Sequence, residues 1–86
     1  MGQKEFSEAQ LKVKQLPDQP PNILLDLYSL FKQATVGDIT GERPGMFDFK
    51  GRAKFEAWAS RKGLTQDAAM EQYATLVAAL LKENGL

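Results

Sequence analysis

The chain has 86 residues, its 11 lysines and arginines equal its 11 aspartates and glutamates, and it contains neither histidine nor cysteine. A chain of this length supports one domain with a single small core. The missing residue types exclude disulfide scaffolds, thiolate or imidazole metal sites, and Ser-His or Cys-His catalytic pairs. The neutral net charge provides no overall field for binding nucleic acid, so any recognition of phosphate has to be local.

Targeting signals are not evident. Residues 1–10 include Lys4, Glu5 and Glu8 and no apolar run, which does not resemble a secretory signal. No stretch approaches the roughly 18 apolar residues of a membrane-spanning helix. We therefore expect a soluble, cytoplasmic protein.

The N-terminal segment predicts a short helix. Four apolar residues recur at helical spacing: Phe6, Ala9, Val13 and Leu16. Pro17 and the Pro20-Pro21 pair oppose continuation of the helix, so it is expected to end near Gln15.

A second helix is predicted from about Pro21 to Ala34, because proline suits a first helical turn and an apolar run follows. The apolar residues cover more than one face, which is more than a surface helix of a small bundle needs. Two interpretations stay open. The helix is either central, with neighbours on both sides, or one wall of a ligand groove lined by residues 24–31.

The segment between Gly37 and Gly51 predicts a long, ordered crossover without a helix, since turn-forming residues punctuate it: Asp38, Gly41, Pro44, Gly45 and Asp48. Five apolar residues argue against a flexible linker: Val36, Ile39, Met46, Phe47 and Phe49. Asp38 is expected either to order the loop or to pair with Arg43.

Two helices are expected after the crossover. The third spans about residues 49–62, with Asp48 as its cap and Gly63 as its stop. Thr65 caps the fourth, in which apolar residues repeat at three and four positions: Ala69, Tyr73, Leu76, Val77 and Leu80. The predicted fold is an all-α four-helix bundle, and the long connection between helices two and three opposes a simple up-down-up-down order.

Cations gather at the start of the third helix. Lys50 and Lys54 share one face and Arg52 is nearby. A helix N-terminus favours anions, so this cluster is mildly unfavourable unless it recruits an anion such as phosphate. The alternative is an exposed, solvated charge cluster.

Lys32 favours a ligand site, because it follows Tyr28 by four residues and Phe31 by one. A purine that stacks on an aromatic ring while lysine holds its phosphate is a recurrent form of nucleotide binding. The alternative is that Tyr28 and Phe31 are ordinary core residues, and Tyr73 is ambiguous in the same way. No carboxylate pair suits acid–base catalysis and no spacing suits a metal, so we expect neither an enzyme nor a cofactor.

Two stretches together resemble the signature of the acyl-CoA-binding protein family: Tyr28-Ser29-x-x-Lys32-Gln33-Ala34-Thr35-Val36-Gly37-Asp38 and Arg43-Pro44-Gly45-Met46-x-Asp48-Phe49-Lys50-Gly51-x-Ala53-Lys54. The resemblance covers nearly the whole chain, so residues 1–86 are expected to form one domain. It implies an up-down-down-up bundle that binds one long-chain fatty acyl-CoA thioester, buffers it and carries it through the cytosol.

The resemblance implies individual roles as well. Lys32 and Lys54 would hold the 3′-phosphate, Tyr28 would hydrogen-bond near it, and Phe31 would meet the adenine. At positions 31 and 55 this chain has phenylalanine where many members have tyrosine and tryptophan.

The rest of the implied site surrounds the acyl chain. Leu24 and Leu25 would cover part of the chain, and Tyr73 would lie by its end. The full set of implied ligand-binding residues is Lys14, Leu24, Leu25, Tyr28, Ser29, Leu30, Phe31, Lys32, Lys50, Lys54 and Tyr73.

Two other functions stay open. A helical interaction module would bind a partner's helix through helix two and would not respond to coenzyme A esters. Single-stranded nucleic-acid binding is opposed by the neutral charge and would ignore acyl length. The expected carrier is a monomer, because no large apolar stripe remains beyond the groove. It is expected to contact membranes or acyl-CoA-using enzymes only transiently, and not nucleic acid.

Overall fold

The computed structural model describes residues 2–86, so Met1, which belongs to the expected domain, lies outside the described residues. The all-α prediction is confirmed. The helices are α1 (Gly2–Lys12), α2 (Pro21–Thr35), α3 (Phe49–Ala59) and α4 (Gln66–Glu83), and a 3₁₀ turn (Val13–Gln15) follows α1. No helix within residues 2–86 is long and apolar enough to cross a membrane.

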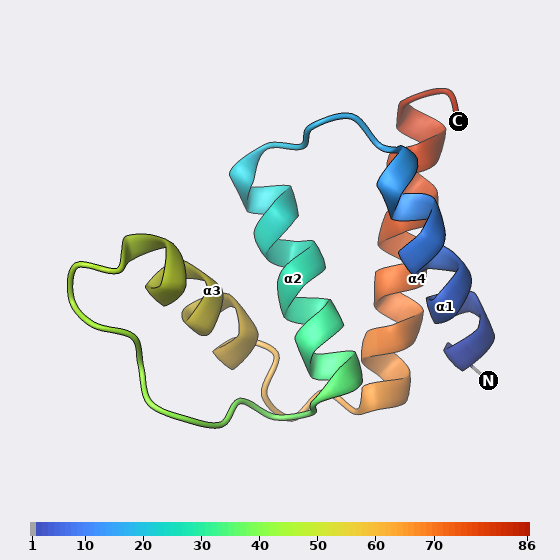
Figure 1. The fold of residues 1–86 in the computed structure, drawn as a ribbon. Helices are drawn as coiled ribbons and strands as arrows, with labels where there is room; N and C mark the ends of the chain where they lie inside the picture. The colour runs from blue at the N-terminus through green and yellow to red at the C-terminus, as the bar shows by residue number, and fades with distance from the viewer. Residues whose placement is uncertain (1) are drawn as a thin grey trace.

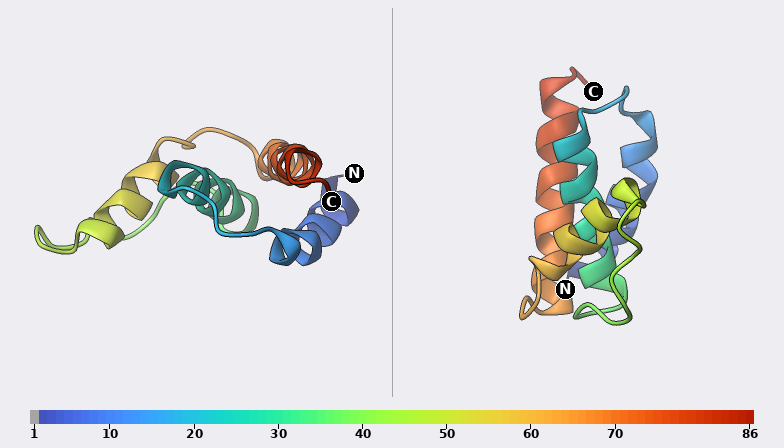
Figure 2. Two further views of the ribbon diagram at one scale, coloured as in Figure 1. Left: turned by 90° about the horizontal axis from the view of Figure 1, so that it is seen from above. Right: turned by 90° about the vertical axis from the view of Figure 1, so that its left-hand side faces the viewer.

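The helices run up, down, down and up, as Figure 1 shows. The crossover returns along the length of α3, and this return lets α2 and α3 point the same way. The helix α4 packs on both α1 and α2, whereas α3 packs on α2. The molecule is flat, with extents of 39 × 28 × 16 Å, and α1 and the crossover lie at opposite ends of it (Figures 1 and 2).

Local capping contacts start the two C-terminal helices as predicted. The Asp48 carboxylate accepts a hydrogen bond from the Gly51 N–H at 2.9 Å, and the Thr65 hydroxyl accepts one from the Ala68 N–H at 3.1 Å. Each contact satisfies a backbone donor that has no partner inside its helix.

The end of α3 differs from the prediction by three residues. We expected the helix to reach Lys62, but it ends at Ala59. The N–H of Lys62 donates to the carbonyl of Ala59, three residues back, so the chain tightens before Gly63 reverses it at a φ of 93°. Glycine takes this left-handed conformation without strain.

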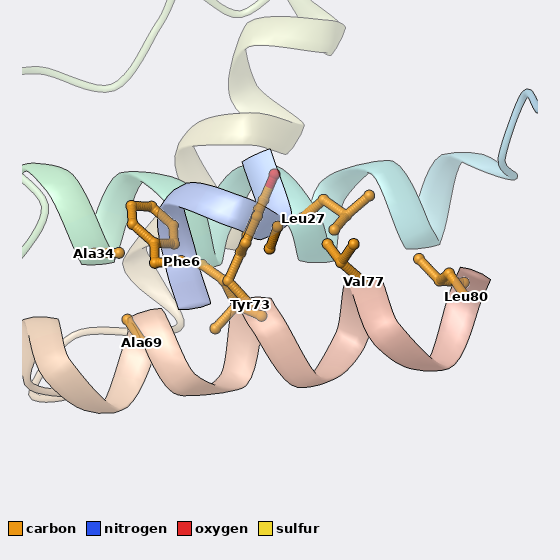
Figure 3. Packing of buried hydrophobic residues seen from close by; sticks show 9 residues of the cluster. Phe6, Leu27, Ala34, Ala69, Tyr73, Val77 and Leu80 are labelled. Atoms are coloured by element: carbon orange, nitrogen blue, oxygen red, sulfur yellow. The ribbon is translucent and has the colours of Figure 1, made fainter. Parts of the chain in front are cut away.

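The core forms around one face of α4 (Figure 3). The buried apolar residues are Phe6 and Ala9 of α1, Leu27, Leu30 and Ala34 of α2, and Ala69, Tyr73, Val77 and Leu80 of α4. The predicted apolar stripes of α1 and α4 are therefore confirmed. Since α2 packs on α4 and on α3, it is also the central helix of the first interpretation.

Gln33 and Asp38 join the C-terminal end of α2 to the loop before α4. The buried Gln33 amide donates from Nε2 to Asp38 Oδ1 at 2.8 Å and to the Leu64 carbonyl at 2.7 Å. Asp38 Oδ1 also accepts from the Gly63 N–H at 2.9 Å. These contacts hold the start of the crossover and the loop after α3 against the C-terminal end of α2.

The crossover is held by hydrogen bonds rather than by apolar packing. Asp38 orders its start, and the Trp58 indole N–H donates to the Gly37 carbonyl at 2.8 Å. Arg43 does not pair with Asp38; it pairs with Glu56 at 3.1 Å. The apolar residues that we expected to hold the crossover are largely exposed at four of five positions: Val36, Met46, Phe47 and Phe49.

A pH-dependent contribution to stability follows from Asp38. The Gly63 N–H, followed by the Gln33 amide, holds the pKa of Asp38 below its ordinary value of 3.8. A depressed folded pKa stabilises the fold above pH 3.8, and the contribution is lost as the pH falls through the folded pKa. We expect Asp38→Asn to be less stable than the parent at pH 7, with the difference shrinking below pH 3.8.

Urea unfolding followed by circular dichroism at several pH values measures this difference. The matched control is Asp18→Asn, which changes an exposed carboxylate in the connection before α2 and should leave the stability at pH 7 close to that of the parent. A stability difference for Asp38→Asn that stays constant from neutral to acidic pH would contradict the assignment.

Candidate functional site

Two lysines and two aromatic rings meet where α2 and α3 pack. The Lys32 Nζ of α2 lies 4.8 Å from the centre of the Trp58 ring of α3. In the reverse sense, the Lys54 Nζ of α3 lies 5.3 Å from the centre of the Tyr28 ring of α2. Both contacts have cation–π geometry, which orients an ammonium group without neutralising its charge.

Neither ammonium group has a carboxylate partner among residues 2–86. The ion pairs among the described residues join Arg43 to Glu56 and Arg61 to Asp26. Lys50 adds a further cation on the exposed first turn of α3. Compact ammonium charges without counterions on two facing helices suit an anionic group such as phosphate.

Phe31 belongs to a cluster of three rings contributed by three helices. Its ring centre lies 6.1 Å from that of Phe6 and 6.3 Å from that of Tyr73, while Phe6 and Tyr73 meet edge to face at 5.1 Å. Phe31 is only half-buried, so it packs on the core and still reaches the surface.

The hydroxyl of Tyr73 points away from the α4 backbone (Figure 3). It makes no hydrogen bond to any group in residues 2–86, although a buried tyrosine usually has a partner for this group. Burial raises the pKa of Tyr73. The hydroxyl is therefore a neutral polar group without a hydrogen-bond partner among the described residues.

An open, mainly apolar pocket lies where the 3₁₀ turn approaches the start of α2. Its volume is about 400 Å³, and it is lined by Val13, Leu16, Pro17, Asp18, Gln19, Leu24 and Leu27. Leu24 is 53% exposed despite being apolar. Leu25 is half-buried beside it in the sequence, and the exposed Lys14 lies in the 3₁₀ turn.

Two residues of the expected site, Ser29 and Leu30, lie neither at the surface formed by the lysines and aromatic rings of α2 and α3 nor at the apolar pocket. Ser29 is 1% exposed, and its hydroxyl donates to the Asp26 carbonyl and accepts from Arg61 Nε, each at 3.0 Å. Leu30 is 4% exposed and belongs to the core. Both are covered because α2 has packed neighbours on two sides.

Trp58 and Gln33 are important to the site, and sequence reasoning gave neither this role. The ring of Trp58 faces Lys32, and its N–H donates to the carbonyl of Gly37. The available signal was general: a buried indole or amide needs hydrogen-bond partners. The sequence does not say which groups these are.

The two surfaces lie at opposite ends of α2. Leu24 and Lys32 are eight residues apart, which is about 12 Å along a helix. Within residues 2–86 no group of acidic, histidine or cysteine side chains could hold a metal ion. The fold and the two surfaces define a small helical ligand-binding protein.

Comparisons with known proteins identify the family. A model of the acyl CoA binding protein family matches residues 3–77. Acyl-CoA-binding protein homolog 1 of Caenorhabditis elegans is 51% identical over 81 residues, which cover 93% of this chain and 94% of that protein. An acyl-CoA-binding protein of Brassica napus is 52% identical over 84 residues, covering 95% and 91%.

A solved structure agrees with these sequence relatives. The crystal structure of Acyl-CoA-Binding Protein 2 of Oryza sativa matches with a TM-score of 0.95 and 44% identity, covering 99% of this chain and 96% of that one. The chain belongs to the acyl-CoA-binding protein family. Membership implies acyl-CoA binding, and the family is one of binding proteins rather than enzymes.

Tyr73→Phe tests whether the tyrosine hydroxyl contributes to the stability of the fold. Because the hydroxyl has no partner in residues 2–86, its removal should change the free energy of unfolding by less than about 0.5 kcal/mol. Tyr73→Ala is the contrasting variant and should cost about 3–5 kcal/mol, since it empties a buried ring site. Urea unfolding measures both. A large loss for Tyr73→Phe would mean that the hydroxyl supports the fold.

Proposed function

We propose that the chain is an intracellular carrier that binds one long-chain fatty acyl-CoA, buffers it and transports it through the cytoplasm as a monomer. Residues 1–86 act as a single acyl-CoA-binding domain. The observation that carries the proposal is the reciprocal arrangement of Lys32 and Lys54, each held over a ring of the facing helix and without a carboxylate partner among residues 2–86.

The head group of the ligand accounts for these charges. A phosphate monoester carries about −1.5 to −2 charges at neutral pH, and coenzyme A also has a diphosphate. In the proposed complex Lys32 and Lys54 hold the 3′-phosphate, and Tyr28 hydrogen-bonds near it. Phe31 meets the adenine with the part of its ring that reaches the surface, and Lys50 adds local positive charge.

The acyl chain extends between the apolar pocket at the other end of α2 and the ring cluster that contains Tyr73. Leu24 and Leu25 cover part of it near the pocket, Lys14 borders the pocket region, and Tyr73 lies by the end of the chain. Burial contributes roughly 0.8 kcal/mol per CH₂, so six more methylenes add up to about 5 kcal/mol if they are fully covered. Affinity should therefore depend strongly on chain length.

Ser29 and Leu30 serve the site indirectly. Both side chains are covered by protein, so they hold α2 in position rather than touch the ligand. Ser29 does so through Arg61, and Leu30 does so through its packing in the core.

Lys32→Ala and Lys54→Ala test the head-group assignment when each is titrated with palmitoyl-CoA and with its 3′-dephospho analogue. A hydrogen bond to a charged group contributes about 1.5–3 kcal/mol, so each variant should bind palmitoyl-CoA roughly tenfold more weakly or worse. Each should bind the dephospho analogue almost as the parent does, because the group that the lysine contacts is already missing.

Lys4→Ala, at an exposed lysine of α1, is the matched control and should bind both ligands like the parent. Circular dichroism should show unchanged helix content for all three variants. Equal losses for the two ligands would remove the lysines from the 3′-phosphate, and unchanged affinities would remove them from the site.

A further inference from the structure

The hydroxyl of Tyr73 is the polar end of a side chain that is otherwise held in the core. Tyr73 is 5% exposed, and its ring centre lies 5.1 Å from that of Phe6 and 6.3 Å from that of Phe31. The side chain extends from α4 toward α1 (Figure 3). Within residues 2–86, Gln33 Oε1 is the fully buried side-chain polar atom that lacks a hydrogen-bond partner. The Tyr73 oxygen therefore belongs to the small part of its side chain that reaches the surface.

This hydroxyl is a polar group beside apolar neighbours. The rings of Phe6 and Phe31 carry no polar atom, and burial raises the pKa of Tyr73, so the hydroxyl keeps its proton at neutral pH. A protonated phenol can both donate and accept a hydrogen bond. Water can supply these bonds when no ligand is bound. A ligand group that covers the hydroxyl displaces that water, and a covered hydroxyl without a new partner weakens binding.

We propose that the Tyr73 hydroxyl adapts the site to acyl-CoA thioesters whose chains end in a hydroxyl group. The proposal rests on the proposed function, in which the end of the acyl chain lies by Tyr73. A terminal methyl group would cover the phenol oxygen and offer it no partner. A terminal hydroxyl group forms a hydrogen bond with the phenol, and this bond offsets the loss of water by both groups.

The position of the hydroxyl on the chain matters as much as its presence. An acyl-chain site that is apolar throughout binds a hydroxylated chain more weakly, because the hydroxyl loses its hydrogen bonds to water and gains none. Tyr73 removes this penalty at one point of the site, which is the end of the chain. A hydroxyl beside the thioester gains nothing from Tyr73.

Isothermal titration calorimetry of the parent and of Tyr73→Phe, each with palmitoyl-CoA and with ω-hydroxypalmitoyl-CoA, tests the proposal. The measured quantity is the ratio of the two dissociation constants within each protein, which cancels any general effect of the substitution. The parent should bind the two thioesters within about threefold of each other. Tyr73→Phe keeps the ring but should bind the hydroxylated thioester about tenfold more weakly than palmitoyl-CoA, because the terminal hydroxyl is then buried without a partner.

Thr75→Val is the matched control variant, because it removes an exposed hydroxyl from α4 two residues beyond Tyr73. It should keep the ratio of the parent. The matched control ligand is α-hydroxypalmitoyl-CoA, whose hydroxyl lies on the carbon beside the thioester carbonyl. Its affinity relative to palmitoyl-CoA should be the same in the parent and in Tyr73→Phe.

Equal ratios in the parent and Tyr73→Phe would overturn the proposal, and so would a parent that binds ω-hydroxypalmitoyl-CoA more than about tenfold more weakly than palmitoyl-CoA. A ratio that changes only for the α-hydroxy thioester would put the Tyr73 hydroxyl at the thioester and would also overturn it. In each case tight binding of palmitoyl-CoA would leave the carrier function standing. A parent that binds neither palmitoyl-CoA nor its ω-hydroxy form would overturn both.

Discussion

The buried amide of Gln33 joins the end of α2 to the start of the crossover, five residues on, and to the loop before α4, 31 residues on. Asp38 completes the junction by accepting from the Gly63 N–H. Because α3 packs on α2 as its main neighbour, the position of α3 depends on this junction and on the Trp58–Gly37 hydrogen bond. The alignment of Lys54 with Tyr28 depends on it in turn.

This arrangement keeps the lysines ordered but available. A cation–π contact contributes about 0.5–1 kcal/mol at an exposed site. A hydrogen bond between charged groups contributes about 1.5–3 kcal/mol, so a phosphate can displace the rings as the preferred partner of Lys32 and Lys54. A carboxylate in place of each aromatic ring would compete with the ligand for the charge of the lysine. Within residues 2–86 neither lysine has a carboxylate partner.

Much of the fold was predictable because its signals are local. The helical spacing of apolar residues, the caps at Asp48 and Thr65 and the glycine at 63 each act within a few residues of the chain. The family signature then implied the topology. The burial of Ser29 and Leu30 was not predictable in the same way, since it depends on which neighbours cover each face of α2.

In the candidate site and the crossover, too, local features were predictable from the sequence, and features that depend on distant neighbours were not. The sequence indicated that lysines and aromatic rings would gather, but not that each lysine would lie over a ring of the opposite helix. Likewise, the apolar residues of the crossover argued against a flexible linker, yet Phe47 among them is 84% exposed. Hydrophobicity indicates that burial of a side chain would be favourable, but it does not indicate that another element lies close enough to cover it.

In the proposed carrier, one site joins recognition of a charged head to burial of an apolar chain. Isothermal titration calorimetry with palmitoyl-CoA, free coenzyme A and free palmitate at equal concentrations separates the two contributions in one experiment. We expect tight one-to-one binding of the thioester and much weaker binding of either half. Absence of heat and of thermal stabilisation with palmitoyl-CoA, or equal affinity for the thioester and one half, would contradict it.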